Sequence, residues 1–263
     1  MLSFNASTAA DLEPIALVLA DIRHRADECG VDFMVVGATA RDILIRHVAG
    51  TVPERATADI DVAVAVSSWS HLRQLTGPLT RHENSEHKFE VRGTEVDVIP
   101  FGAIEDARRT ITWPNDYHMN VFGFREAMAT AVRVTLPGDL VVAVASLPAQ
   151  SLLKLFAWQD RHNDDTRDAV DLKSIILAYH EGPYLEELYT SHVPLIEKHD
   201  FDPRLAGANR IGLEARALID PENLDIVTDL LDSPQHFDLL AADMGGLVRE
   251  NRSLLTAYRE GFA

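Results

Sequence analysis

Two aspartates separated by one residue mark the segment best suited to chemistry. Asp59 and Asp61 lie in the stretch ADIDVAV, a short apolar run that is typical of a buried strand. Side chains two apart on a strand point to the same face, so both carboxylates project together while Ile60 and Val62 face the core. Adjacent carboxylates repel each other unless a cation lies between them or one takes up a proton. Taken alone, the pair is more typical of a solvated strand end.

A third acid favours a metal site. Asp97 lies in EVDVI, a second short apolar strand. If the two strands are neighbours, Asp97 can join Asp59 and Asp61, and Glu95, which shares a face with Asp97, is the alternative ligand. Magnesium prefers oxygen ligands, and phosphoryl-transfer sites often hold two such ions. We therefore expect two Mg²⁺ ions bound by Asp59, Asp61 and Asp97.

The segment VVGATARD, upstream of the aspartates, predicts a strand that turns directly into a helix. Gly37 permits close approach of a ligand to the backbone, and the helix start offers free N–H groups, including that of Ala38, to a phosphate. Thr39 could add a hydroxyl donor, and Arg41 completes the candidate nucleotide-binding set. A tight turn without any ligand explains the same residues equally well.

Strands and helices alternate in the first half of the chain and helices alone follow. The patterns predict helices at 10–28, 39–48 and 69–75, single strands at 33–36 and 60–66, and two hairpins, 88–92 with 94–99 and 132–136 with 140–145. Residues 100–114 show no readable pattern. After residue 148 long amphipathic helices dominate, beginning with 149–160 and 165–179. We therefore predict an α+β domain over residues 1–146, with a mixed sheet flanked by helices, and an all-helical domain over 147–263.

The order of these motifs resembles a known superfamily. A strand and glycine turn, then Asp-x-Asp, then a third acid in an apolar strand is similar to the nucleotidyltransferases of the polymerase beta type. VVGATARDIL with ADIDVAV also resembles the head motif of CCA-adding enzymes and poly(A) polymerases, although their further motifs have no counterpart here. The series SLLKLFA, then DR, then RDAVDL instead resembles the AbiEii-type nucleotidyltransferase toxins, whose relatives include the mycobacterial MenT toxins. The resemblance covers about residues 35–177.

The resemblance implies transfer of a nucleoside monophosphate from an NTP to RNA, with the 3′ end of tRNA as expected acceptor, growth arrest as the outcome and an antitoxin as partner. It implies that Lys154 approaches the nucleotide phosphates. It also implies that Asp168 or Asp171, one helical turn apart, positions the acceptor or acts as base; ion pairing with Arg161 or Arg167 is the alternative. The chain departs from the family at Ala38, where serine or glycine is usual.

The net charge of −17, from 41 acidic and 24 basic residues, excludes a protein that coats nucleic acid nonspecifically. A local basic strip remains open, and the first half holds Arg41, Arg46, Arg55, Arg108 and Arg109. The acidity also suits a small cationic acceptor, as in an antibiotic-type nucleotidyltransferase. Two further alternatives are transfer to a protein side chain and a non-catalytic nucleotide-binding protein.

Other features narrow the class of protein. A single cysteine excludes an internal disulfide and a Cys-rich metal site. No apolar run reaches the length that spans a bilayer, and no secretory signal is readable, so we expect a cytoplasmic protein that does not bind membranes. Trp113, Tyr117 and Phe122 could stack on a base, but core packing is the favoured interpretation.

Overall fold

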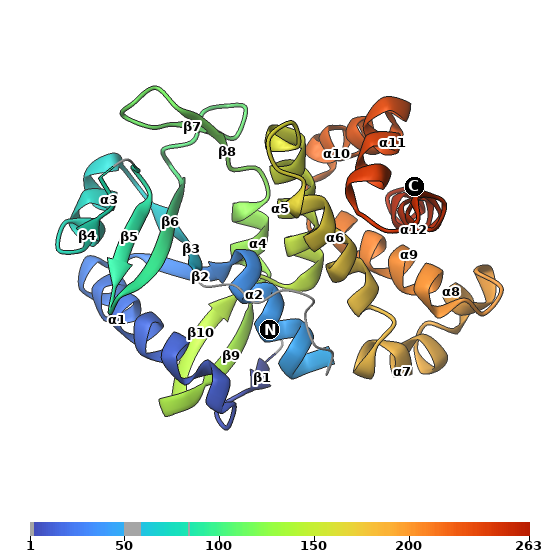
Figure 1. Ribbon diagram of the computed structural model, residues 1–263, viewed down its shortest axis with the longest axis horizontal. Coiled ribbons are helices and arrows are strands. Elements are labelled where there is room, and N and C mark those ends of the chain that lie inside the picture. Colours follow the sequence, from blue (N-terminus) through green and yellow to red (C-terminus); the bar gives the residue numbers. More distant parts are fainter. Residues whose placement is uncertain (1–2, 50–58, 84) are drawn as a thin grey trace. The chain divides into compact units, whose positions relative to one another are not determined.

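The computed structural model describes residues 3–49, 59–83 and 85–263, which divide into two compact units (Figure 1). The first unit comprises residues 3–43 with the described residues of 59–146. The second comprises residues 147–263 together with 44–49. Across the described residues, no helix combines the length and the apolar character that crossing a membrane requires.

A mixed sheet of eight strands forms the centre of the first unit. Its order is β1 (Ser3–Asn5), β9 (Val132–Leu136), β10 (Leu140–Val144), β2 (Asp32–Val36), β3 (Ile60–Val66), β6 (Thr94–Gly102), β5 (Lys88–Val91) and β4 (Thr80–Arg81). The pairs β3–β6, β1–β9 and β10–β2 are parallel, and the others are antiparallel. Both predicted hairpins are confirmed, as β5–β6 and β9–β10. The sequence patterns missed β1 and β4.

Four α-helices belong mainly to this unit: α1 (Glu13–Cys29), α2 (Gly37–Leu44), α3 (Trp69–Thr76) and α4 (Phe124–Ala129). A 3-10 turn at Ala10–Leu12 leads into α1, which contacts β2, β10 and α3 through an apolar face that includes Leu19 and Ile22. Helix α2 begins at Gly37 rather than at Thr39, because it follows β2 with no intervening loop, and it continues as a π-helix over Ile45–Ala49.

The region that showed no pattern contains the end of β6 and strand β7 (Thr110–Thr112), which pairs with β8 (His118–Asn120), just beyond the region, in a separate two-stranded sheet. Strands of three residues are too short to show alternation, so this ribbon could not be predicted from periodicity. A further short element, a 3-10 turn at Pro137–Asp139, joins β9 to β10.

The described residues of the second unit form helices and the turns between them (Figure 1). These are α5 (Leu147–Arg161), α6 (Arg167–Ala178), α7 (Gly182–Thr190), α8 (Val193–Lys198), α9 (Pro203–Arg216), the 3-10 turn Pro221–Asn223, α10 (Leu224–Asp232), α11 (Pro234–Asp243) and α12 (Val248–Glu260). Helix α9 is central and contacts α5, α6, α7, α8 and α12. The predicted fold class is therefore confirmed: a mixed sheet flanked by helices, then helices alone.

The close approach of α9 and α12 depends on small residues. A Cβ at Gly212 of α9 would lie 2.1 Å from the main-chain oxygen of Tyr258, so only glycine fits there. The Tyr258 hydroxyl is fully buried and lies 2.9 Å from Ser151 Oγ of α5, which satisfies both polar groups. These contacts tie α5, α9 and α12 into one packed core.

Candidate functional site

The register of two parallel strands brings two of the predicted acids together. Strands β3 and β6 are neighbours, and Asp61 lies directly opposite Asp97. The flanking residues Ile60, Val62 and Val96 are buried in the core. Because side chains alternate along a strand, Asp61 and Asp97 share the opposite face of the sheet. Asp59 lies just before β3, two residues from Asp61.

The turn between β2 and α2 packs directly against Asp61. Val36, the last residue of β2, pairs with Asp61 of β3, and Gly37 follows with a φ of +63°. A Cβ at Gly37 would lie 2.0 Å from Asp61 Oδ2. Any other residue at position 37 would therefore displace the carboxylate as well as strain the backbone. The glycine of the predicted phosphate turn is required in this structure by the aspartate.

Thr39 and Arg41 of the same turn are engaged by the protein itself. Thr39 is 1% exposed, and its hydroxyl donates to the main-chain oxygen of Asp59 at 3.0 Å. Arg41 is 3% exposed, and its Nε and Nη2 atoms lie 2.8 and 2.6 Å from Asp42 Oδ1. Thr39 thus holds the main chain of Asp59 in place, Arg41 pairs with its neighbour in α2, and Ala38 is half-buried.

Lys88 and His87 complete the surroundings of Asp97, and the sequence interpretation did not include them. Lys88 pairs with Asp97 across β5 and β6, with Nζ 3.4 Å from Asp97 Oδ1, and it also hydrogen bonds to Glu95. His87 Nε2 lies 3.9 Å from Asp97 Oδ2. A hairpin turning at Gly93 fixes this register, so the predicted hairpin already contained the signal.

The charges of Lys88 and His87 oppose the effect of burial on the pKa of Asp97. Burial raises the pKa of Asp97, and the charges of Lys88 and His87 offset the rise only in part. Burial would lower the pKa of Lys88, but its hydrogen bond to Glu95 and the charges of Asp97 and Glu95 outweigh burial and raise it. Lys88 is therefore a firmly protonated cation beside an acid that burial destabilises in its charged form.

The donor set on this face fits magnesium in its chemistry. Asp59, Asp61 and Asp97 offer carboxylate oxygens from two neighbouring strands, the ligand type that Mg²⁺ prefers. Within residues 3–49, 59–83 and 85–263, however, no three His, Cys, Asp or Glu side chains are already arranged around a common centre. Asp97 interacts instead with Lys88 and His87. A metal would have to draw Asp97 away from Lys88.

The other two predicted catalytic residues lie in the second unit and bind each other. Lys154 of α5 lies 2.9 Å from Asp168 Oδ1 and 2.7 Å from Asp171 Oδ2, both on α6. Arg161 Nε lies 2.6 Å from Asp168 Oδ2. The charge of Lys154 is thus balanced by two carboxylates of α6, and no phosphate is needed to explain its position. The arginine partner weighed for Asp168, Arg161, is present.

The pKa values in this cluster follow from the pairing. Burial raises the pKa of Asp168, but the hydrogen bond from Arg161 and the charge of Lys154 outweigh burial and lower it. Burial would lower the pKa of Lys154, and the charges of Asp168 and Asp171 instead raise it. Lys154 and Asp168 are therefore both charged near neutral pH, as a buried ion pair requires.

The predicted basic strip is mostly occupied. Arg109 bonds to Glu105 Oε2 at 2.5 Å and to both carboxylate oxygens of Glu126 at 3.0 and 3.1 Å. Its guanidinium also lies 5.5 Å from the ring of Phe122. Arg108 is exposed, whereas Arg55 lies outside the described residues. Of the arginine pair at 108–109, only Arg108 remains open to an acceptor.

The aromatic residues considered for base stacking mainly form core. Trp113 is buried, with its ring centroid 5.3 Å from that of Trp69 and 5.7 Å from that of His87. Phe122 is also buried, whereas Tyr117 is 55% exposed. Core packing is confirmed for Trp113 and Phe122. Through its contact with His87, Trp113 also supports the surroundings of Asp97.

Comparisons with known proteins give only distant similarities. No family model and no curated protein matches the chain. Its fold is similar to the solution structure of the antibiotic-resistance factor ANT(2″)-Ia, at 16% identity and a TM-score of 0.42, over 71% of this chain and 97% of that one. The complex of ANT(2″)-Ia with adenylyl-2″-tobramycin matches at 13% identity and a TM-score of 0.41, over 75% of this chain and 98% of that one. The Thermotoga maritima CCA-adding enzyme in complex with tRNA matches at 14% identity and a TM-score of 0.25, over 93% of this chain and 80% of that one. Because these TM-scores are low, the proposed function is inferred from the site residues of this chain and not from these proteins.

Proposed function

We propose that the protein is a magnesium-dependent nucleotidyltransferase that transfers a nucleoside monophosphate from an NTP to an acceptor. The observation that carries this proposal is the pairing of Asp61 with Asp97 on adjacent parallel strands. The Asp61 carboxylate also packs against the turn at Gly37, where a side chain would collide with it. Paired carboxylates next to a helix start are the arrangement that phosphoryl transfer needs for binding charged phosphates through cations.

The reaction forms one phosphorus–oxygen bond and breaks another. The acceptor oxygen attacks the α-phosphorus of the NTP in line with the leaving group, and pyrophosphate departs with the electrons of the broken bond. The proton of the acceptor hydroxyl passes to Asp97, the carboxylate that lies opposite Asp61 on the neighbouring strand. Two magnesium ions held by Asp59, Asp61 and Asp97 would neutralise the triphosphate and lower the pKa of the acceptor hydroxyl.

RNA is the acceptor that we propose first, with the 3′ end of tRNA as its reactive group and a growth-arresting toxin as the biological role. A small cationic acceptor is the second candidate. The net charge of −17 favours it, as does the internal pairing of Arg41 and Arg109, which leaves few cations for a polyanion in the described first unit.

The test offers each labelled NTP, with magnesium, to total RNA, to tobramycin and to a protein extract. Wild type is compared with Asp61→Asn and with Asp32→Asn, an exposed aspartate on β2 of the same sheet. We expect label in RNA with wild type and Asp32→Asn, and none with folded Asp61→Asn. Label in tobramycin alone would select the second acceptor. Activity in Asp61→Asn, or no labelled acceptor with wild type, contradicts the proposal.

The toxin role has a separate test in cells. Induced expression of wild type should arrest growth, whereas equal expression of Asp61→Asn should not. A protein that suppresses the arrest by binding the chain would be the antitoxin. Normal growth during expression of active wild type contradicts the toxin role and leaves the chemistry standing.

A further inference from the structure

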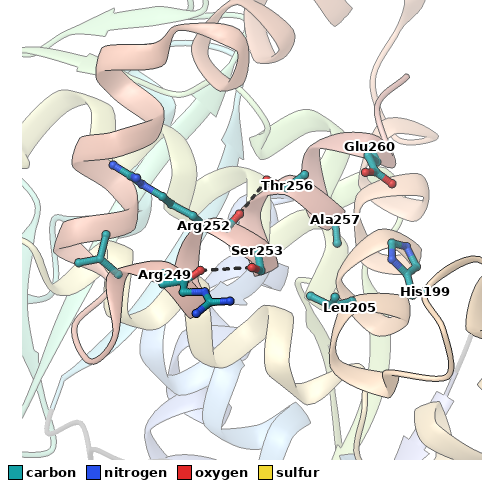
Figure 2. Close-up of a pocket in the computed structure, with 9 residues that line it drawn as sticks. His199, Leu205, Arg249, Arg252, Ser253, Thr256, Ala257 and Glu260 are labelled. Atoms are coloured by element: carbon teal, nitrogen blue, oxygen red, sulfur yellow. Dashed lines mark hydrogen bonds between the residues drawn. The ribbon is translucent and has the colours of Figure 1, made fainter.

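A cleft with a volume of about 620 Å³ opens along α12 in the second unit (Figure 2). One wall is α12, and the other comes from the turn after α8 and the start of α9. The lining residues are His199, Leu205, Val248, Arg249, Arg252, Ser253, Thr256, Ala257 and Glu260. The volume lies within the range of small-molecule sites. None of these residues takes part in the proposed transfer chemistry.

Arg249 is the lining cation that is available to a ligand. It is exposed, and its guanidinium makes no hydrogen bond or ion pair with the part of the chain that the structure describes. Arg252, one turn further along α12, is instead held by Asp238 at 3.1 Å. At the other end of the cleft Glu260 is neutralised by Lys198 at 2.9 Å. The cleft therefore carries a net positive charge in a strongly acidic protein.

His199 adds an unsatisfied polar atom. Its Nε2 is buried and has no hydrogen-bond partner among the described residues. Burial lowers the pKa of His199, so the ring is neutral near neutral pH and, according to its tautomer, can donate or accept a hydrogen bond at that nitrogen. A buried polar atom without a partner costs free energy that a ligand would recover. Figure 2 shows His199 and Leu205 facing Ser253 and Ala257 across the cleft.

The remaining lining distinguishes the two ends of a ligand. Leu205 and Ala257 give an apolar surface beside His199, whereas Arg249 lies about two helical turns earlier on α12 and forms a polar end (Figure 2). A guanidinium binds phosphate through two parallel hydrogen bonds. A ligand that matches both ends has an anionic phosphate joined to a largely apolar body that carries at least one hydrogen-bonding group.

We propose that this cleft binds one phosphorylated nucleoside, with the phosphate on Arg249 and the base beside His199 and Leu205. The nucleoside can be a free nucleotide or one residue of an RNA strand, because both present the same group. The site is independent of Asp59, Asp61 and Asp97, so its binding requires neither magnesium nor transfer activity.

Binding is measured with the full chain in EDTA, which removes metal-dependent binding at the carboxylates. The probes are AMP, by calorimetry, and a fluorescein-labelled ten-nucleotide single-stranded RNA, by anisotropy. Arg249→Ala should weaken binding by about tenfold, as expected for loss of a hydrogen bond from a charged group. Arg216→Ala, which removes an exposed arginine outside the cleft, should leave it unchanged. Binding of both probes identifies a free nucleotide as sufficient, and binding of RNA alone identifies a strand.

A second variant tests the space rather than the charge. Ser253 is exposed, so Ser253→Phe should fill the cleft without unfolding α12 and should abolish binding while the thermal midpoint stays unchanged. The ring proton signals of His199 should shift when AMP is added to wild type. Equal binding by Arg249→Ala and Arg216→Ala, or binding of neither probe by wild type, overturns the site. Asp61→Asn should bind as wild type does, so this result stands or falls separately from the proposed transferase activity.

Discussion

The ion pair between Lys88 and Asp97 can be tested by a substitution that keeps the length of the side chain. Lys88 Nζ lies 3.4 Å from Asp97 Oδ1, and burial already raises the pKa of Asp97. Lys88→Met removes the charge that opposes this rise. The pKa of Asp97 should therefore increase further, and a charged Asp97 should become more costly to the folded state.

The magnitude follows from the distance and the exposure. Coulomb's law at 3.4 Å gives about 5 kcal/mol at a dielectric constant of 20 and about 1.2 kcal/mol in bulk water. The Lys88 side chain is 35% exposed and shares its charge with Glu95, so screening favours the lower value. We expect a coupling of roughly 1–1.5 kcal/mol, which is about one pKa unit.

The sign predicts how stability changes with pH. The pKa of Asp97 is higher in the folded than in the unfolded chain, so its contribution to stability is present below the unfolded pKa and is lost as pH rises through the folded pKa. Lys88→Met raises the folded pKa and deepens that loss. The variant should therefore resemble wild type most closely at acid pH and fall below it as pH approaches neutrality.

The measurement is urea unfolding of wild type, Lys88→Met, Asp97→Asn and the double variant, at about pH 4 and pH 7. The pH-dependent part of the Lys88→Met effect should disappear in the Asp97→Asn background. Repeating the comparison in a Glu95→Gln background separates the contribution of Glu95, the second partner of Lys88, from that of Asp97. Equal destabilisation at both pH values, or an effect that survives in Asp97→Asn, would refute the assignment of Lys88 as counter-charge to Asp97.

Substitutions at three further contacts are tested by urea unfolding, the last with an exposed arginine as control. Gly37→Ala should destabilise by more than about 1 kcal/mol, because the new Cβ meets the Asp61 carboxylate at a positive φ; a neutral result would contradict the packing of the turn. Lys154→Met should cost about 3–5 kcal/mol, because Asp168 and Asp171 both lose the buried lysine and Asp168 keeps only Arg161 as an ion-pair partner; a smaller loss would place the lysine in solvent. Arg109→Met should cost a comparable amount, whereas exposed Arg108→Met should change stability by less than about 0.5 kcal/mol; equal effects would exclude the buried pairing.

Much of the first unit could be predicted because its strands are apolar runs with clear boundaries. Ile60–Val66 and the hairpin that turns at Gly93 were readable in this way, and parallel pairing of β3 with β6 placed Asp61 opposite Asp97 as expected. Strand β1, by contrast, has three residues and pairs with β9, far along the chain. Nothing local in such a short segment indicates a strand.

The candidate site was predicted less completely, because its charged groups are matched by partners distant in sequence. Lys154 among leucines suggested a phosphate, but only the packing of α5 on α6 reveals Asp168 and Asp171 as its partners. Arg109 was a candidate for a basic strip, but its carboxylate partner Glu126 lies on α4, which the sequence patterns missed. Spacing along one element identifies faces, whereas ion pairs between elements depend on tertiary structure.

The connectivity of the sheet determines when the first unit can fold during synthesis. Ser3 of β1 pairs with Arg133 of β9, and Val35 of β2 pairs with Val144 of β10. The main-chain edges of β1 and β2 that pair with β9 and β10 therefore stay open until those strands have left the ribosome, shortly before the helices from Leu147 begin to emerge. Pairings between residues so far apart in sequence form slowly and leave strand edges open to aggregation. The first half of this chain accordingly carries unpaired strand edges for most of the time in which it is synthesised.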